Sequence, residues 1–204
     1  MGANDTIPLP GTPGEEDDAS LMARAAAGDA EAFATIVHRW RRRIYAFAVR
    51  MTCDAVLAED VTQDAFARAF QARARWRPRA RVSTWLYTIA KNAVLDRARR
   101  RTERTVSPAA GANTTGLLGR IPDGALTPCS SAQNLELEIA VETALAGLPE
   151  TYRLPVVLCS MEGMSYAEAA EVAGVNEKTL SSRLARGREM LREALKPHLG
   201  EGAR

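Results

Sequence analysis

The chain contains 204 residues, carries a formal net charge of +2 and has an aromatic content of only 5%. Ala and Arg are abundant, which favours helices over strands because these side chains lose little freedom in a helix. The first twenty residues lack a basic start and an apolar run, and nowhere do eighteen apolar residues follow one another. We therefore expect neither a secretory signal nor membrane insertion, and a soluble protein in the cytoplasm.

The small net charge conceals a strong segregation of charge along the chain. Residues 1–38 contain seven acids and one base, whereas residues 68–104 contain twelve bases and two acids. A local field of that strength indicates a polyanionic partner, and nucleic acid is the usual one. Charge alone leaves open the alternative that these bases form a solvated helix face.

Cysteine and histidine usage gives no sign of a metal site. Cys53, Cys129 and Cys159 are far apart in the sequence and form no C-x-x-C pair. Neither His38 nor His198 has ligand-like spacing to another candidate ligand. We expect reduced cysteines that act as small apolar residues, and no metal or cofactor. No nucleophile–base pair or phosphate-cradling loop is recognisable either, so we expect no catalytic residues and no enzyme activity.

The N-terminal half is predicted to be a helical bundle that follows a disordered tail. Residues 1–18 combine Pro and Gly with four consecutive acids, which is typical of a disordered acidic tail. Within residues 19–104, Asp29 and Asp54 are plausible N-caps of two helices. Apolar side chains after Asp29 recur in steps of three and four, and the buried stripe that they predict is Phe33, Ile36, Val37, Trp40, Ile44, Phe47, Ala48 and Met51.

A third helix of the bundle is predicted from about Ser83 to Arg101. Pro78 separates it from the preceding helix, because proline lacks an N–H group and restricts the residue before it. The side chains predicted to face inward are Trp85, Leu86, Ile89, Ala90 and Ala93. Three or four helices with one shared core would make a compact bundle.

A change of composition at residue 105 separates the two halves of the chain. Residues 105–134 are rich in Gly, Pro, Ser and Thr without periodicity, which predicts a flexible linker. Helical periodicity returns in residues 135–200, where Pro155 lies deep enough in a helix to kink it. No alternating apolar–polar run occurs. The sequence therefore predicts an all-α fold of two small helical domains, an N-terminal bundle and a C-terminal helix-turn-helix domain, joined by the linker.

The C-terminal domain contains the pattern of a helix-turn-helix motif. Ser165 and Glu168 have the spacing of a capping box. Gly174 can end that helix with a positive φ, and Asn176 can cap the next one. A helix, a short glycine turn and a second helix form the geometry that places the second helix in a DNA major groove. An ordinary helical hairpin is the alternative, and the basic residues at the start of the second helix favour DNA binding over it.

Several segments resemble the extracytoplasmic-function (ECF) sigma factors of bacteria. The segments that carry the resemblance are AEDVTQDAF at 58–66, STWLYTIAKN at 83–92, LPE at 148–150, EGMSYAE at 162–168 and SRL at 182–184. The first two are similar to the family's AEDLVQEVF and RTWLYRIARN. The resemblance covers about residues 20–104 and 135–196, in the family's order and with its spacer between them.

The resemblance implies a surface for core RNA polymerase. Asp60, Gln63 and Asp64 stand at i, i+3 and i+4 and so share one exposed helical face. In the family this face docks on the clamp helices of the polymerase's largest subunit, where arginines would meet the carboxylates. The alternative is solubilising charge on a surface helix.

The resemblance also implies a surface for the promoter element nearest the start site. Asn92 and Asp96 lie where the family reads an unstacked base of the melted non-template strand. Pairing of Asp96 with Arg99 or Arg100 is a structural alternative that the sequence leaves open. The arginines expected to hold phosphates and retain the opened strand are Arg75, Arg77, Arg79, Arg81, Arg97, Arg99, Arg100 and Arg101.

The second helix of the helix-turn-helix would read the distal promoter element. By resemblance, the base-facing positions are Ser181, Ser182, Ala185 and Arg186, and the positions near the DNA backbone are Lys178, Thr179 and Arg183. The family commonly has Gly at the position of Lys178 and Lys or Arg at that of Ser181. Ala185 is too short for a polar contact, although it could touch a thymine methyl group. We therefore expect modest affinity for duplex DNA at this element.

The function that these features predict is that of a sigma factor. It would bind core RNA polymerase, recognise a two-part promoter, help to melt it and be held by an anti-sigma factor, as members of the family usually are. A conventional helix-turn-helix regulator that acts without polymerase is one alternative, but it leaves the acids at 60–64 and the arginine-rich helix unexplained. A nucleic-acid-processing enzyme with a DNA-binding tail is another, and the lack of a catalytic constellation counts against it.

Overall fold

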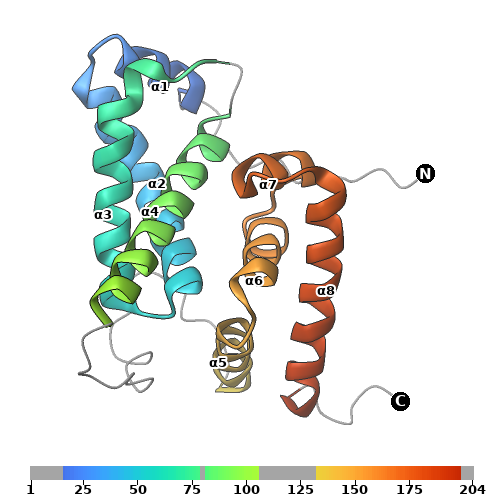
Figure 1. Ribbon diagram of the computed structural model, residues 1–204. Helices are drawn as coiled ribbons and strands as arrows, with labels where there is room; N and C mark the ends of the chain where they lie inside the picture. Colours follow the sequence, from blue (N-terminus) through green and yellow to red (C-terminus); the bar gives the residue numbers. More distant parts are fainter. Residues whose placement is uncertain (1–15, 79–80, 106–131, 199–204) are drawn as a thin grey trace. The chain divides into compact units, whose positions relative to one another are not determined.

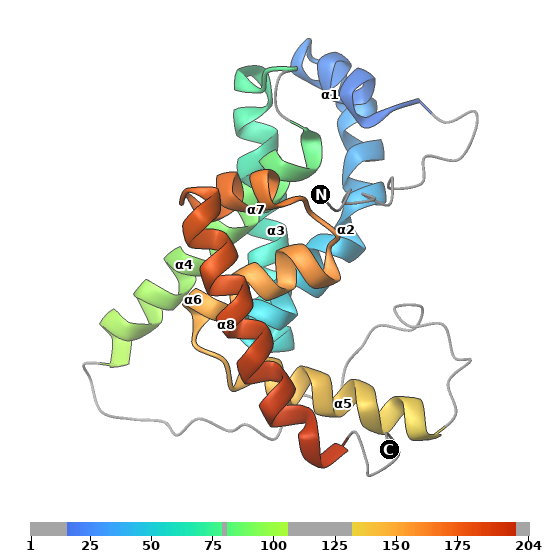
Figure 2. The same cartoon turned by 90° about the vertical axis from the view of Figure 1, so that its right-hand side faces the viewer.

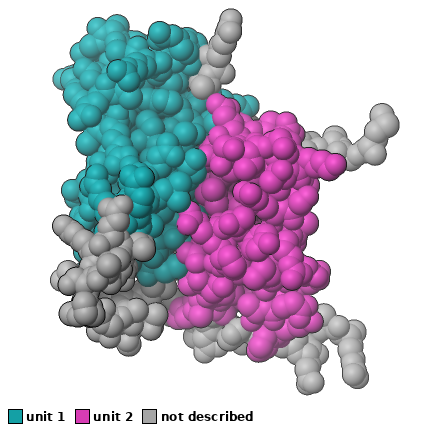
Figure 3. Space-filling view, viewed as in Figure 1, with its two compact units in different colours: residues 1–116 teal, residues 117–204 magenta. Residues whose placement is uncertain are grey.

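The computed structural model describes residues 16–78, 81–105 and 132–198, and only helices occur as regular elements within them. The chain divides into two compact units, residues 1–116 and residues 117–204, which are coloured separately in Figure 3. The predicted all-α fold of two helical domains is therefore confirmed. The linker predicted at 105–134 lies almost entirely outside the described residues.

Within residues 16–78 and 81–105, the N-terminal unit consists of four α-helices. They are α1 (Asp18–Ala26), α2 (Ala30–Thr52), α3 (Ala55–Ala72) and α4 (Val82–Thr105), and a 3-10 turn, η1 (Arg73–Arg75), follows α3. Figure 1 shows α3 and α4 running in opposite directions side by side, and α2 packs against both of them, as the turned view of Figure 2 also shows. This antiparallel packing brings polar side chains of α3 and α4 together across their exposed faces.

Local sequence signals place the helix starts. Asp29 caps α2 by accepting hydrogen bonds from the backbone N–H groups of Glu31 and Ala32, and Asp54 caps α3 in the same way. Both predicted caps are confirmed. α1 begins at Asp18, whose carboxylate accepts a hydrogen bond from Nε1 of Trp40 at 2.9 Å and pairs with Arg39. An acid from the end of the predicted tail thus fastens α1 to α2.

The core of the N-terminal unit is centred on Tyr87. Its ring is almost completely buried and meets Phe47 and Trp40 edge to face, with ring centroids 5.2 and 6.2 Å apart. Trp85 and Ile89 were predicted to face inward but are only half-buried. The buried face of α4 is rotated relative to the prediction because the helix packs on both α2 and α3. The predicted stripe of α2 is buried apart from Val37, which is half-buried.

The C-terminal unit contains a second set of helices. Its elements are α5 (Ala132–Ala146), α6 (Glu150–Val156), a π-helical turn η3 (Val157–Met161), α7 (Tyr166–Ala173), α8 (Glu177–Leu195) and a 3-10 turn η4 (Lys196–His198). Pro155 lies inside α6, and regular α-helix gives way to the π turn after Val156, where the N–H of Glu162 donates to the carbonyl of Val157. The long α8 packs against α5, α6 and α7.

The end of α5 is closed by a side chain from the next helix. The guanidinium of Arg153 donates hydrogen bonds to the backbone carbonyls of Ala146 and Leu148, each at 2.8 Å from Nη2. These carbonyls would otherwise lack partners at the helix terminus. Leu145 and Leu148, which flank the turn, are buried. Arg153 therefore fixes the angle between α5 and α6.

We predict that Arg153→Met destabilises the C-terminal unit by about 1–3 kcal/mol, because it leaves these carbonyls unsatisfied. The far-ultraviolet circular dichroism melt should move to lower temperature. The fluorescence melt should not, since all three tryptophans lie in the N-terminal unit. Arg192→Met, on the exposed side of α8, is the matched control and should change stability little. Equal melts for the two variants would contradict the capping role of Arg153.

Candidate nucleic-acid interface

The helix-turn-helix forms from the local signals that predicted it. The hydroxyl of Ser165 accepts a hydrogen bond from the backbone N–H of Glu168, and the Glu168 carboxylate accepts one from the Ser165 N–H at 3.0 Å. Gly174 ends α7 with a φ of +71°, and Asn176 caps α8 by accepting from the Thr179 N–H at 2.8 Å. The capping box, the glycine turn and the second cap are all confirmed.

The predicted distal-element residues lie on the solvent side of α8. Leu180 and Leu184 are buried and hold the opposite side of the helix against the unit. Of the seven predicted side chains, Thr179 and Arg183 are half-buried. The other five are exposed: Lys178, Ser181, Ser182, Ala185 and Arg186. The structure therefore brings the predicted set together on one accessible surface, which we call the α8 face.

In the N-terminal unit, a cluster of charged side chains joins α3 to α4. Arg68, on α3, donates hydrogen bonds from Nε and Nη2 to the two carboxylate oxygens of Asp64, at 3.1 and 2.8 Å. The same guanidinium donates from Nη1 to Asp96 on α4, at 2.6 Å. Nearby, Nη1 of Arg97 on α4 lies 3.1 Å from Asp60 on α3. We call these five residues the α3–α4 cluster.

The cluster changes how the predicted polymerase-facing acids are presented. Asp60 and Gln63 are exposed, with 54% of the Asp60 side chain accessible. Asp64 retains 26% of its side-chain exposure and is held by two hydrogen bonds from Arg68. The three residues share one face of α3, as predicted, but Asp64 is already engaged within the chain.

Asp96 has a hydrogen-bond partner that was not considered from sequence, Arg68 on α3. The hydrogen bond from Arg68 lowers the pKa of the Asp96 carboxyl below its ordinary value, and the nearby charges of Arg99 and Arg100 lower it further. The alternative left open from sequence, pairing of Asp96 with Arg99 or Arg100, thus gains a further partner, Arg68 on α3, which donates a hydrogen bond to the carboxylate. Sequence spacing could reveal only the Asp64–Arg68 pair at i and i+4, because the bond to α4 depends on how the two helices pack.

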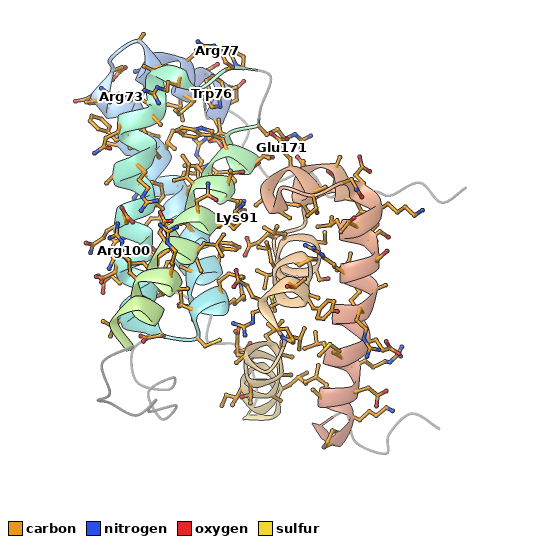
Figure 4. The ribbon with its side chains drawn as sticks, in the orientation of Figure 1. Arg73, Trp76, Arg77, Lys91, Arg100 and Glu171 are labelled. Atoms are coloured by element: carbon orange, nitrogen blue, oxygen red, sulfur yellow. The ribbon has the colours of Figure 1, made fainter. Side chains whose placement is uncertain are left out.

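The remaining predicted proximal-element residues lie along α4 and the loop before it. Asn92, Arg99 and Arg100 are exposed, and Arg97 is partly buried. Figure 4 shows Arg77 beside the loop that precedes α4 and Arg100 toward the far end of that helix. The Arg77 guanidinium donates to the carbonyls of Ala74 and Trp76. Arg75 and Arg81 are exposed, whereas the side chains of Arg79 and Arg101 lie outside the described part of the chain.

The tryptophans on either side of this loop differ in burial. Trp76 is 5% exposed, as expected for a core residue, and its buried Nε1 has no hydrogen-bond partner among the described residues. Trp85 is half-buried at the start of α4. Among the residues that the structure describes, no group of three or more His, Cys, Asp or Glu could hold a metal ion. No helix in those described ranges is long and apolar enough to cross a membrane.

Two family models match the chain, one in each unit. The model described as sigma-70 region 2 matches residues 36–104, and the model described as sigma-70, region 4 matches residues 138–191. The first covers most of α2 and nearly all of α3 and α4, which hold the α3–α4 cluster, and the second covers most of α5 through α8. Both surfaces described above thus fall inside matched regions.

Similar proteins cover nearly the whole chain. The ECF RNA polymerase sigma factor SigW of Bacillus subtilis is 35% identical over 83% of this chain and 91% of its own length. The RNA polymerase sigma-H factor of Pseudomonas aeruginosa is 33% identical, covering 92% of this chain and 98% of that protein. A solved structure of CnrH in complex with the cytosolic domain of CnrY is 27% identical, with a TM-score of 0.65 and coverage of 89% and 99% of the two chains.

Because the pKa of Asp96 is lowered, the stability of the folded N-terminal unit should decrease as the pH falls. A lowered carboxyl pKa stabilises the folded state above the ordinary value of 3.8, and that stabilisation is lost as the pH falls through the folded-state pKa. We predict that the tryptophan fluorescence melt of the wild type moves to lower temperature between about pH 5 and pH 3. Asp96→Asn should reduce this shift, because its amide cannot be protonated in that range.

Asp17 and Asp29 also have lowered pKa values, through backbone hydrogen bonds at helix starts, so part of the shift should persist in Asp96→Asn. Glu138→Gln, in the other unit, is the matched control and should retain the full wild-type shift. If Asp96→Asn followed the wild type at every pH, ionisation of Asp96 would make no measurable contribution to the stability of the folded unit.

Proposed function

We propose that this chain, which belongs to the ECF sigma factor family, is the specificity subunit that brings core RNA polymerase to a two-part promoter and helps to melt it. The observation that carries the proposal is the presence of both sigma regions, in order, on two separate helical units. A helix-turn-helix regulator that acts without polymerase would account for the second unit alone. The chain is not an enzyme, in keeping with that family.

The work is divided between the two units. Residues 19–104 form the domain that binds core polymerase, recognises the proximal element and opens the DNA. Residues 135–200 form the domain that recognises the distal element. Residues 105–134 link them, and the acidic segment 1–18 precedes both, although its last residue, Asp18, already lies in α1. The placement of the two matched regions, 36–104 and 138–191, supports these boundaries.

Core polymerase binds the exposed side of α3. Asp60 and Gln63 supply an accessible carboxylate and an amide, while Asp64 contributes through a carboxylate that Arg68 orients. Carboxylates on a helix surface are suited to charge-assisted hydrogen bonds with arginines of a partner. The clamp helices of the polymerase's largest subunit, the partner of this face in the family, would supply those arginines.

Promoter DNA binds along α4 at the proximal element and along α8 at the distal one. At the proximal element, Asn92 and Asp96 read an extruded base, and the basic side chains hold phosphates: Arg77, Arg79, Arg81, Arg97, Arg99 and Arg100. At the distal element the α8 face enters the major groove, with hydroxyls and arginines toward base edges and phosphates. Duplex DNA is the partner of α8, and the melted non-template strand is the partner of α4.

An anti-sigma protein holds this chain inactive until a signal releases it. The similar structure of CnrH was solved with the cytosolic domain of CnrY bound to it. The bound part of CnrY is a cytosolic domain, which supports a cytoplasmic location for this chain as well. Co-purification from cells at normal expression level is the test, and recovery of the chain with core polymerase alone would argue against such a partner.

The function itself is tested by adding the purified chain to core polymerase. Gel filtration should show one complex, and run-off transcription from a template with a mapped start should depend on the chain. Duplex binding without any polymerase complex would instead identify a conventional regulator. Chemical turnover of the nucleic acid would identify an enzyme.

Asp60→Asn should weaken binding to core polymerase about 10- to 100-fold, because a charge-assisted hydrogen bond is lost. The measurement is fluorescence anisotropy of a labelled chain titrated with core enzyme. Glu138→Gln removes the same charge from the other unit and should bind like the wild type. Unfolding of Asp60→Asn is checked by its tryptophan fluorescence. Equal affinities of the two folded variants for core polymerase would remove Asp60 from the interface.

Lys178→Ala should weaken promoter binding at the distal element uniformly across base sequences. Loss of one phosphate contact also lowers the slope of log affinity against log salt concentration by about one unit. The holoenzyme is titrated with promoter duplexes at several salt concentrations. Lys196→Ala, whose ammonium pairs with Glu193 at the other end of α8, should leave the slope unchanged. An unchanged slope in Lys178→Ala would show that Lys178 does not contact a DNA phosphate.

A further inference from the structure

One guanidinium in the N-terminal unit serves two carboxylates to which different roles are proposed. Arg68 donates two hydrogen bonds to Asp64, on the polymerase-facing side of α3, and one to Asp96, on the promoter-facing helix α4. All three side chains keep partial exposure, of 32% for Arg68, 26% for Asp64 and 38% for Asp96. A partner can therefore still reach them.

We propose that Arg68 is a positioning residue for promoter reading, which holds the Asp96 carboxylate in one orientation on α4. The inference rests on the proposed function and adds to it a residue that would touch neither polymerase nor the base. Arg68 would thus affect the base preference at one promoter position rather than the overall affinity for DNA.

The geometry gives Arg68 this role in preference to the other nearby arginines. The guanidinium of Arg68 is hydrogen-bonded to two carboxylates: Nε and Nη2 donate to Asp64, and Nη1 donates to Asp96. A planar guanidinium held by two hydrogen bonds to one carboxylate has little freedom to turn. Arg99 and Arg100 act on Asp96 through charge, and their side chains are exposed near the end of α4.

The bond also determines what Asp96 can offer a base. Oδ2 accepts the hydrogen bond from Arg68, which leaves Oδ1 as the oxygen available to a ligand. Because an aspartate is ionised at neutral pH, this oxygen can accept a hydrogen bond but cannot donate one. Such an acceptor suits the amino group of an extruded base, for example N4 of cytosine. Without Arg68 the side chain would sample several rotamers among competing arginines, and the acceptor would lose its fixed direction.

The test is a double-mutant cycle read out as base preference. Holoenzymes with wild-type chain, Arg68→Met, Asp96→Asn or both changes transcribe a pool of templates randomised over both promoter elements. Sequencing of the transcripts gives the preference at every position. Each single change should reduce the preference about five- to tenfold at the same single position, and the double variant should lose no more than either.

Arg73→Met is the matched control, because Arg73 directly follows the last residue of α3 and its guanidinium lies over the Phe70 ring. Any effect of Arg73→Met on the base preference should be independent of Asp96. The fold-changes of Arg73→Met and Asp96→Asn should then multiply when the two changes are combined. Arg68→Lys keeps a cation but cannot bind both carboxylates with a fork, so it should give a preference between those of wild type and Arg68→Met. Tryptophan fluorescence verifies that each variant is folded, and if Arg68→Met is unfolded, the cycle is run with Arg68→Lys.

Two outcomes would overturn the proposal. In one, loss of Arg68 alters transcription equally at all positions, which is what a purely structural role would give. In the other, the effects of Arg68 and Asp96 multiply in the double variant, which means that they act independently. A failure of the proposed function looks different, because the wild-type chain would then yield no promoter-dependent transcripts with core polymerase.

Discussion

The antiparallel packing of α3 on α4 is the constraint on which the rest of the N-terminal unit depends. It places Arg68 between Asp64 and Asp96, and Arg97 against Asp60. Carboxylates suited to a protein partner and arginines suited to DNA therefore share one bonded cluster rather than two separate surfaces. Any partner that engages one member of the cluster changes the electrostatic surroundings of the others.

Stability and recognition come from different parts of this unit. Partly exposed ion pairs contribute little to folding free energy, because water already solvates both charges and salt screens them. The stabilising contribution comes instead from buried side chains, centred on the contacts of Tyr87 with Phe47 and Trp40. The role of the α3–α4 cluster is thus better understood as orientation of functional groups, carried on helices that the core holds rigid.

Local signals in the sequence predicted the helix starts and the helix-turn-helix, because a cap or a glycine turn involves residues only a few positions apart. Asp29, Asp54 and the Ser165 capping box are examples. Contacts between helices could not be predicted in this way. The bond from Arg68 to Asp96 spans 28 positions, and the burial of Tyr87 in place of Trp85 depends on how α4 is turned against two neighbours. The residues of the candidate site were therefore identifiable by type and by family resemblance, but their partners were not.

The most direct test of the account is to map transcript 5′ ends made by core polymerase on genomic DNA from the source organism, with and without the chain. If the two units together read a promoter, the added chain creates a new set of start sites. These starts share two short upstream sequences at a constant separation, one for each unit. An identical set of starts with and without the chain would contradict the account, however well the chain binds duplex DNA alone.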